Sequence, residues 1–350
     1  MKTTNLFLRY AILIVASFGL IAGMTAGSHA QEISVSGPIM FFKDQPNIEP
    51  SGVEPIGDGT YLLVADDNTR DLLIVEKQTG KILRTNLVIP GLNRNADWEA
   101  MAKDGDDFYL IGSKGLLFRF RLNEQEKDWS KIQVTGAKEI VINNFDLVKT
   151  ELKGRRPEIE GLAIYVNDQK KELVVGIREH QSADKPRTAA IHFFRAEILE
   201  EGLTLKPFFN FDASEPAVPG SADLAWHLSS IEHVSDWGGF LVMTTTENKD
   251  RYYGNVLWFV QEDQLKQNSN AQGTFRSVVP TKSKVFQESL PGGRPGIKGE
   301  GLAVLSDDDS KPSKQTLSVV IVFDNDSRAP SALMLIELSK PPNAADRSGF

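Results

Sequence analysis

The sequence contains no cysteine among its 350 residues and only five histidines. A chain without cysteine forms no disulfide bonds, offers no thiol nucleophile and holds no iron–sulfur cluster. Nitrogen and sulfur ligands for zinc or copper are therefore scarce, whereas oxygen ligands are plentiful. Helical periodicity is also nearly absent, so we expect an all-β protein whose stability comes from an apolar core.

Long apolar runs are missing after the first thirty residues. The run from Ala11 to Gly23 follows the basic residues Lys2 and Arg9, and Ser28-His29-Ala30 offers a small-residue cleavage site. This arrangement predicts a signal peptide over residues 1–30 and a mature protein that is periplasmic or secreted. An uncleaved anchor is the alternative, but the run is short for a bilayer. We expect no membrane insertion by the rest of the chain.

The chain has fewer basic than acidic residues, 39 against 47, which gives it a formal net charge of −8. Loss of residues 1–30 would remove Lys2 and Arg9 and change the net charge to −10. An acidic surface argues against nucleic acid and anionic membranes as partners and is compatible with cations. We expect a monomer that takes a small anionic substrate, or a protein or glycan ligand.

A short motif recurs along the chain. Three copies are close to one another, and two weaker copies carry serine where the others carry glutamate. The copies are Trp98-Glu99-Ala100-Met101-Ala102, Ile159-Glu160-Gly161-Leu162-Ala163, Gly299-Glu300-Gly301-Leu302-Ala303, Ser51-Gly52-Val53-Glu54 and Ser229-Ser230-Ile231-Glu232.

Each copy precedes a turn and then a strand rich in β-branched and aromatic residues, as in Gly57-Asp58-Gly59 before Tyr61-Leu62-Leu63-Val64. The equivalent motif positions, from Ser51 to Glu300, are 48, 61, 69 and 71 residues apart. Such spacings suit four-stranded units with loops of varied length. Repeated four-stranded meanders without helices predict a single β-propeller, with five blades favoured and six as the alternative. Two sandwich domains are disfavoured, because no linker-like segment separates the units.

The expected propeller covers residues 31–340, and residues 341–350 read as a disordered tail. In the fourth unit, Val256 to Gln261 and Thr274 to Val279 are predicted strands. The last unit has only three strands and ends after Ala332 to Leu338. Its missing outer strand could be Ile33 to Phe42, which would close the ring and leave no open sheet edge.

The topology of a propeller predicts where functional side chains come together. The start of each innermost strand and the loop after each second strand meet on one face of the disc. This face should collect Glu99, Glu160 and Glu300 with Ser51 and Ser229, together with residues that end the second strands: Asp66, Asp67, Ser113, Arg178, Glu179, Glu247, Asp324 and Asp326.

Carboxylates that point at one axis repel one another unless a cation neutralises them or some take up protons. Oxygen ligands favour Ca²⁺, so we expect calcium held by Glu99, Glu160 and Glu300, with Asp66 and Asp324 as further ligands. The alternative is that the glutamates bind backbone amides of neighbouring blades and hold the repeat together.

Four other residues are candidates for chemistry at this face. Arg178 could clamp a phosphate or carboxylate, or form a salt bridge to a ring glutamate. His180, His227 and His233 could act as general bases, or could be structural histidines.

The Glu-Gly-Leu-Ala strand starts, with Leu110-Ile111-Gly112-Ser113, Val175-Gly176-Ile177-Arg178 and Val322-Phe323-Asp324, resemble an uncharacterised bacterial β-propeller family, a domain of unknown function. The resemblance covers residues 50–340. That family is in turn distantly similar to phytase-like and esterase-like propellers, which bind calcium at an acidic face and hydrolyse phosphoesters. The resemblance implies a metal role for Glu99, Glu160 and Glu300.

The sequence therefore favours a calcium-dependent hydrolase that acts on a small phosphoester, ester or lactone. A non-catalytic envelope protein that binds a protein or glycan is the alternative.

Overall fold

The computed structural model describes residues 39–42, 48–92, 96–123, 128–146, 148, 157–167, 170–179, 190–213, 226–248, 251–266, 275–278, 280–286, 298–305, 316–324 and 330–340. The chain divides into two units, residues 1–32 and 33–350, and every described residue belongs to the second. The predicted signal peptide, the predicted tail, His180 and Asp326 lie outside the described residues.

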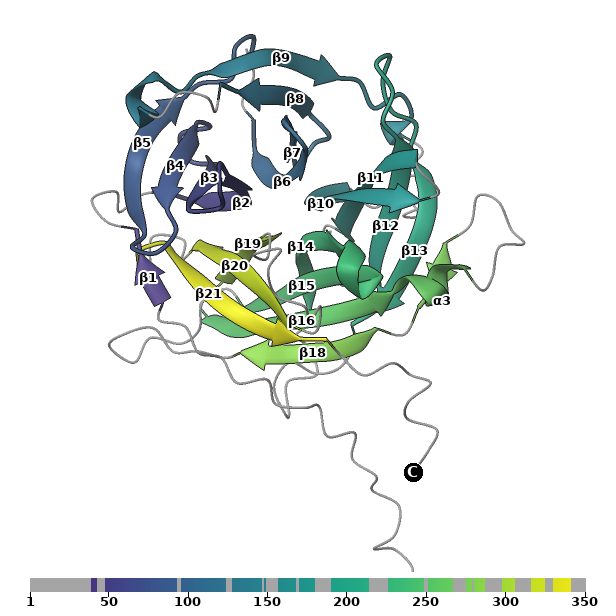
Figure 1. The fold of residues 1–350 in the computed structure, drawn as a ribbon. Helices are drawn as coiled ribbons and strands as arrows, with labels where there is room; N and C mark the ends of the chain where they lie inside the picture. Colours follow the sequence, from purple (N-terminus) through teal and green to yellow (C-terminus); the bar gives the residue numbers. More distant parts are fainter. Residues whose placement is uncertain are drawn as a thin grey trace, which may run out of the picture. The chain divides into compact units, whose positions relative to one another are not determined.

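Twenty of the described strands form five four-stranded meanders round a central axis (Figure 1). Blade 1 contains β2 (Pro50–Ile56), β3 (Tyr61–Asp66), β4 (Leu72–Glu76) and β5 (Lys81–Leu87), and blade 2 contains β6 (Trp98–Asp104), β7 (Asp107–Gly112), β8 (Leu117–Leu122) and β9 (Val134–Ile140). Blade 3 contains β10 (Pro157–Asn167), β11 (Lys170–Glu179), β12 (Ala190–Glu197) and β13 (Lys206–Asp212). Blade 4 contains β14 (His227–Val234), β15 (Gly239–Asn248), β16 (Arg251–Gln261) and β18 (Thr281–Phe286). Blade 5 contains β19 (Lys298–Val304), β20 (Thr316–Asp324), β21 (Ala332–Ser339) and β1 (Ile39–Phe41).

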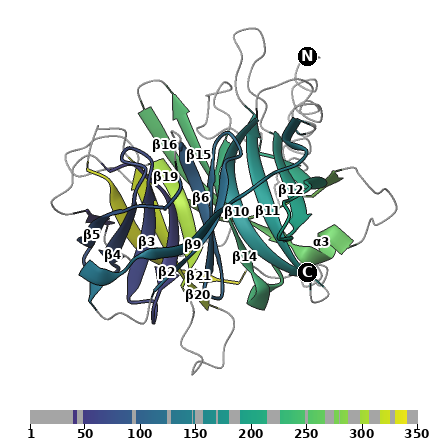
Figure 2. The same ribbon diagram turned by 90° about the horizontal axis from the view of Figure 1, so that it is seen from above.

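The innermost strands contact one another in cyclic order, β2 to β6 to β10 to β14 to β19 and back to β2. Figure 2 shows the same ring from its edge, with the strands of the blades running between the two faces. The protein is thus a five-bladed β-propeller. The predicted fold is confirmed, and the alternative of six blades is wrong.

The N-terminal strand closes the ring. Strand β1 pairs antiparallel with β21, with Ile39 opposite Met334 and Phe41 opposite Ala332. Two further bonds hold this junction, since Phe42 N donates to Ser331 O at 3.0 Å and Ser331 Oγ donates to Ile48 O at 2.6 Å. The predicted closure is confirmed, and β21 has no open edge along β1.

One predicted strand belongs to a different blade. The segment Thr274 to Val279 contains only the short strand β17 (Arg276–Ser277), which pairs in parallel with β13 of blade 3. The outer strand of blade 4 is β18, which pairs with β16. Helix α3 (Glu262–Lys266) leads the chain out of β16 before this excursion, and a local residue pattern does not reveal the partner of a strand.

Helix α3 is short, and no helix within the described ranges is long and apolar enough to cross a membrane.

Apolar side chains fill the space between blades. Each of the five buried clusters in the described residues draws its members from two neighbouring blades. At the junction of blades 3 and 4, for example, Phe209 and Phe240 lie with ring centroids 5.6 Å apart. Because both faces of a blade are covered, its middle strands are apolar on both sides, as in the fully buried run Leu62-Leu63-Val64-Ala65.

A β-bulge interrupts every innermost strand at the repeated motif. The residue left out of the pairing register is Ser51, Glu99, Glu160, Ser229 or Glu300 in blades 1 to 5. A bulge leaves one residue unpaired and changes the direction of its side chain. The five motif positions are therefore structurally equivalent, as the repeat predicted, and the motif encodes a bulge.

The residue after each bulge is small because neighbouring inner strands approach closely there. These residues are Gly52, Ala100, Gly161, Ser230 and Gly301. A Cβ atom at Gly52 would lie 2.8 Å from the backbone nitrogen of Met101 in blade 2. A Cβ atom at Gly161 would lie 2.8 Å from Ile231 Cγ2 in blade 4. The motif thus needs a small residue for contact between blades.

We predict that Gly52→Ala destabilises the protein more than Gly161→Ala. The new methyl group at residue 52 meets backbone of blade 2, which cannot yield, whereas the methyl group at residue 161 meets a side chain that can rotate. Overpacking of this kind typically costs about 1–3 kcal/mol. Denaturant unfolding of both variants measures the difference, and equal losses would contradict the role given to the inner-strand contact.

Candidate functional site

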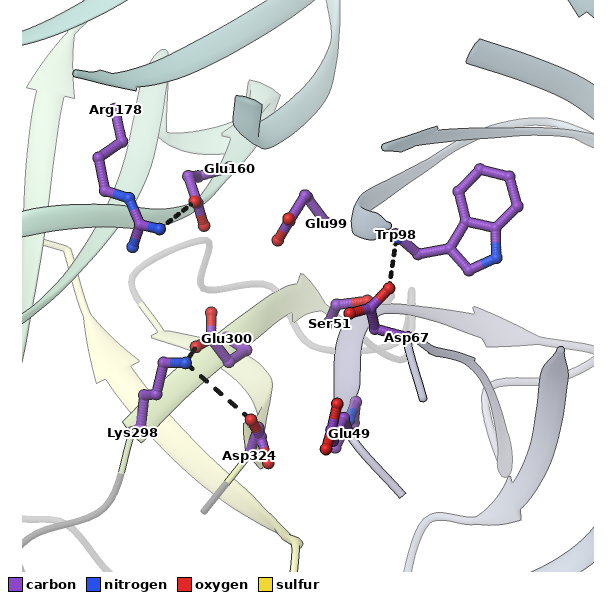
Figure 3. Close-up of a pocket in the computed structure, with 11 residues that line it drawn as sticks. Glu49, Ser51, Asp67, Trp98, Glu99, Glu160, Arg178, Lys298, Glu300 and Asp324 are labelled. Carbon is purple, nitrogen blue, oxygen red and sulfur yellow. Dashed lines mark hydrogen bonds and ion pairs between the residues drawn. The ribbon is translucent and has the colours of Figure 1, made fainter. Parts of the chain in front are cut away.

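The bulged ends of the inner strands surround a cavity of about 200 Å³ at the axis (Figure 3). Its lining is mostly charged and comes from blades 1, 2, 3 and 5 and from the segment that enters blade 1. The lining residues are Glu49, Pro50, Ser51, Asp67, Trp98, Glu99, Glu160, Arg178, Lys298, Glu300 and Asp324. The sequence predicted this face, and the structure brings together Glu99, Glu160, Glu300, Arg178 and Asp324.

At the cavity, the second strands of blades 3 and 5 each carry a charged residue that pairs with an oppositely charged residue of the innermost strand. Arg178 on β11 lies opposite Glu158 on β10, and Asp324 on β20 lies opposite Lys298 on β19. Opposite charges at directly paired positions attract each other across the two strands. Each pair therefore places one basic side chain beside the bulge glutamate of its own blade.

Ion pairs occupy two of the three bulge glutamates. Arg178 Nη2 lies 2.7 Å from Glu160 Oε1 and 3.2 Å from Glu158 Oε2. Lys298 Nζ lies 2.5 Å from Glu300 Oε1 and 4.0 Å from Asp324 Oδ2. The salt bridge to a ring glutamate, one of the two roles considered for Arg178, is therefore present.

Burial controls protonation in this cluster. It raises the pKa of Glu160 to about 8, although Arg178 opposes the shift. It also raises the pKa of Glu300, with Lys298 acting in the opposite direction. The pKa of Arg178 is raised in spite of burial, because Glu160 and Glu158 stabilise the guanidinium cation.

Glu99 differs from the other two bulge glutamates. Among the described residues, no hydrogen bond or ion pair reaches its carboxyl group. Burial, followed by the charges of Glu160 and Glu300, raises its pKa well above the usual range. The raised pKa favours the protonated form of Glu99, which lines the cavity.

The two adjacent aspartates at the end of β3 have different positions. Asp66 is fully buried and does not line the cavity, and its Oδ1 accepts hydrogen bonds from Glu49 N at 2.9 Å and Asn68 N at 3.2 Å. Asp67 faces the cavity, and its Oδ1 accepts a hydrogen bond from Trp98 N at 2.8 Å. Asp66, which was predicted as a metal ligand, thus holds the loop after β3 instead.

The pKa of Asp67 is raised but stays below neutral pH. Burial and the charge of Asp97 raise its pKa to about 6, and the hydrogen bond from Trp98 N limits the shift. Asp67 is therefore mostly ionised at neutral pH but close enough to neutrality to exchange a proton there.

His233 does not join this group. His233 lies on β14 four residues after the bulge residue Ser229, pairs with Glu262 at 2.9 Å, and contacts the rings of Tyr165 and Phe240. Four residues of strand span roughly 13 Å, which separates His233 from the level of the cavity. The structure thus gives His233 a packing position between blades, and His180 lies outside the described residues.

Other groups bond the backbone amides at the bulges. The amide before the bulge residue donates to the preceding blade in three cases: Trp98 N to Asp67 Oδ1, Ile159 N to Ser113 O and Gly299 N to Asn255 Oδ1. The alternative role considered for the glutamates was to bind backbone amides of neighbouring blades. At the bulges of blades 2, 3 and 5 this role is filled by Asp67, Ser113 and Asn255 of blades 1, 2 and 4.

Sequence reasoning missed Lys298 and Glu49, and it did not separate Asp67 from Asp66. Lys298 had a recognisable signal, since it lies two residues before Glu300 as Glu158 lies two residues before Glu160. Its importance depends on the strand pairing with Asp324, which the repeat alone does not reveal.

A second acidic layer lies deeper along the axis. Blades 1 and 4, which carry serine at the bulge, have Glu54 and Glu232 three residues later, whereas the other three blades have alanine there. Blades 1 and 4 are not neighbours, so the charge interaction between Glu54 and Glu232 crosses the axis. Burial raises the pKa of Glu54 to about 8 and that of Glu232 well above the usual range.

The cavity residues do not fit a calcium site as they stand. No group of three or more aspartate, glutamate, histidine or cysteine residues in the described part of the chain is arranged to hold a metal ion. Two of the three glutamates predicted as calcium ligands, Glu160 and Glu300, already bind Arg178 and Lys298.

Comparisons with known proteins concern the fold. No family model matches the chain, and no curated protein matches its sequence. Among solved structures, an α-L-arabinofuranosidase from Lactobacillus brevis is 12% identical over 85% of this chain and 92% of its own, with a TM-score of 0.44. A glutaminyl cyclase from Myxococcus xanthus is 13% identical over 88% and 99%, with a TM-score of 0.42. A mutant levansucrase from B. megaterium is 9% identical over 90% and 94%, with a TM-score of 0.45.

We predict that the protein becomes less stable as the pH rises from 5 to 8. The pKa values of Glu54 and Glu160 are about 8 in the folded protein, above the usual value of 4.5, so the folded state binds more protons over this range. The stability that these protons contribute is complete below pH 4.5 and is lost as the pH passes through 8.

The melting temperature of Glu54→Gln should fall less over this range than that of the wild type. Glu337→Gln, at an exposed position on β21, is the control and should follow the wild type. A pH dependence that is unchanged in Glu54→Gln would contradict the assignment.

Proposed function

We propose that the axial cavity is the active site of a hydrolase in which Glu99 is the general acid and Asp67 the general base. The observation that carries this proposal is that two carboxyl groups in one cavity differ in acidity. Burial raises the pKa of Glu99 well above its usual range, which favours its protonated form, whereas the pKa of Asp67 is about 6. Environments that separate the pKa values of paired carboxyl groups are typical of acid and base roles.

The chemistry would cleave a C–O bond with water. Asp67 takes a proton from the water molecule as its oxygen attacks the carbon atom. Glu99 donates its proton to the oxygen of the leaving group as the C–O bond breaks, and the two carboxyl groups then exchange the net proton through solvent. An ester, a lactone or a glycoside would each provide the bond.

Arg178 and Lys298 support the site from the opposite side. Their ion pairs with Glu160 and Glu300 compensate part of the negative charge round Glu99. Because both cations are already paired, they would set the field in the cavity and would not clamp a substrate anion. This reduces the support for Arg178 as an anchor of an anionic substrate.

We predict that Glu99→Gln and Asp67→Asn each lower kcat by about 10²–10⁴ on a substrate that the wild type hydrolyses. Chromogenic esters, glycosides and phosphoesters provide the panel. The wild-type rate should rise with pH as Asp67 ionises near pH 6 and fall at higher pH as Glu99 ionises.

Each variant should lose one limb of this profile, the acidic limb in Asp67→Asn and the basic limb in Glu99→Gln. Glu337→Gln is the control with wild-type activity expected. Full activity in Glu99→Gln would overturn the assignment, and no turnover on the whole panel would favour a binding protein of the envelope.

A calcium-dependent hydrolase of anionic substrates is the second candidate, favoured by the excess charge of the cavity. Six acidic and two basic residues line it, a difference of four. A divalent cation could replace the protons on Glu99 and Glu160, but Glu160 and Glu300 would first have to leave their basic partners.

We predict that calcium leaves the melting temperature of the wild type unchanged at pH 7. The reason is that two of the three glutamates predicted to bind calcium, Glu160 and Glu300, already form ion pairs with Arg178 and Lys298. Thermal unfolding with calcium and with chelator measures this. A calcium-dependent rise that disappears in Glu160→Gln, with protons released on binding, would instead support the second candidate.

A further inference from the structure

The hydroxyl group of Ser51 is buried without a partner. Ser51 is only 6% exposed, it lines the axial cavity, and its Oγ has no hydrogen-bond partner among the described residues. Ser229 occupies the equivalent bulge in blade 4, and its Oγ donates to Met243 O at 3.4 Å. A buried polar group without a partner destabilises the folded protein, so the difference between the two serines calls for a partner that Ser51 meets in the cavity.

The polar groups of the cavity divide into two sets. Arg178 and Glu160 lie on one side with Lys298 and Glu300, where the basic and acidic groups satisfy one another (Figure 3). Ser51, Asp67 and Trp98 lie on the other side, with the Glu99 carboxyl group between the two sets (Figure 3). A ligand would therefore find its hydrogen-bonding groups at Ser51, Asp67 and Glu99.

These three side chains offer both donors and acceptors. The Ser51 hydroxyl can donate or accept, Glu99 can donate when it is protonated, and the ionised Asp67 can accept. An alcohol group of a ligand can match each of them, because a hydroxyl both donates and accepts. A carboxylate or phosphate would match Glu99 but would face Asp67 and the acidic excess of the cavity.

The cavity can accommodate one small unit of a ligand. Its volume of about 200 Å³ corresponds to roughly seven water molecules at about 30 Å³ each. A six-carbon polyol or one sugar residue is of this order.

We propose that Ser51 is a substrate-binding residue that, together with Glu99 and Asp67, selects an uncharged polyhydroxylated group. This inference rests on the proposed hydrolytic function, and it names the substrate class of the same site: a neutral glycoside or polyol ester. Ser51 contributes to binding, whereas Glu99 and Asp67 act on the bond that breaks.

Equilibrium dialysis with labelled sorbitol and labelled gluconate tests the inference. The two probes have the same carbon chain, but gluconate carries one negative charge. The wild type should bind sorbitol at least tenfold more tightly than gluconate. Ser51→Ala should weaken sorbitol binding about three- to tenfold, the effect of one hydrogen bond, and Ser229→Ala should leave it unchanged.

Stability without ligand provides a second readout. Ser51→Ala should keep or raise the wild-type melting temperature because it removes an unsatisfied buried group, whereas Ser229→Ala should lower it slightly. A clear loss of stability in Ser51→Ala would show that the hydroxyl is already satisfied within the protein and would overturn the inference.

Binding also overturns the inference if the wild type binds neither probe, if gluconate binds as tightly as sorbitol, or if Ser51→Ala binds sorbitol as the wild type does. These outcomes are distinct from a failure of the proposed function. Selective sorbitol binding that depends on Ser51, without turnover of any neutral glycoside or polyol ester, would refute hydrolysis and leave the binding role of Ser51 in place.

Discussion

Close approach of five inner strands is the constraint on which the rest of the structure depends. Neighbouring strands come so near at the motif that only glycine, alanine or serine follows the bulge, and at Gly52 the obstacle is the backbone of the next blade. In every blade, the residue just before this small residue is the bulge residue, which is left out of the pairing register. Packing of the blades and crowding of glutamates at the axis thus have one cause.

The crowded carboxyl groups are neutralised in two ways, and the division follows the blades. In blades 3 and 5 a basic residue two positions before the bulge, or on the paired strand, binds the glutamate. In blade 2 the described residues place no such cation beside Glu99, and burial raises the pKa of its carboxyl group, which favours the protonated form. Burial has the same effect in the deeper layer, where Glu54 and Glu232 occur only in the blades whose bulge residue is serine. Each inner strand therefore has glutamate at only one of these two positions, either at the bulge or three residues later.

The sequence predicted the architecture well because the repeat carries information about both packing and register. A bulge and a small residue at fixed spacing mark each inner strand, and the strand after them is apolar throughout. The repeat could not assign β17, because its parallel partner β13 lies more than sixty residues away in the chain. Nor could it separate Asp66 from Asp67, because the direction of each side chain depends on how the loop after β3 hydrogen-bonds to Glu49 and Trp98. The prediction of calcium relied on the glutamates and did not include Lys298, whose place beside Glu300 follows from tertiary pairing.

The junction between β1 and β21 affects the order in which the molecule can be completed. Ile39 pairs with Met334, so the fifth sheet joins segments from nearly opposite ends of the chain. During synthesis the first four sheets have all their strands well before the last one does. Contacts of such large sequence separation form late and slowly. The last step of assembly is therefore the pairing of β1 with β21, and a nascent chain that still lacks β21 would leave β1 without its partner.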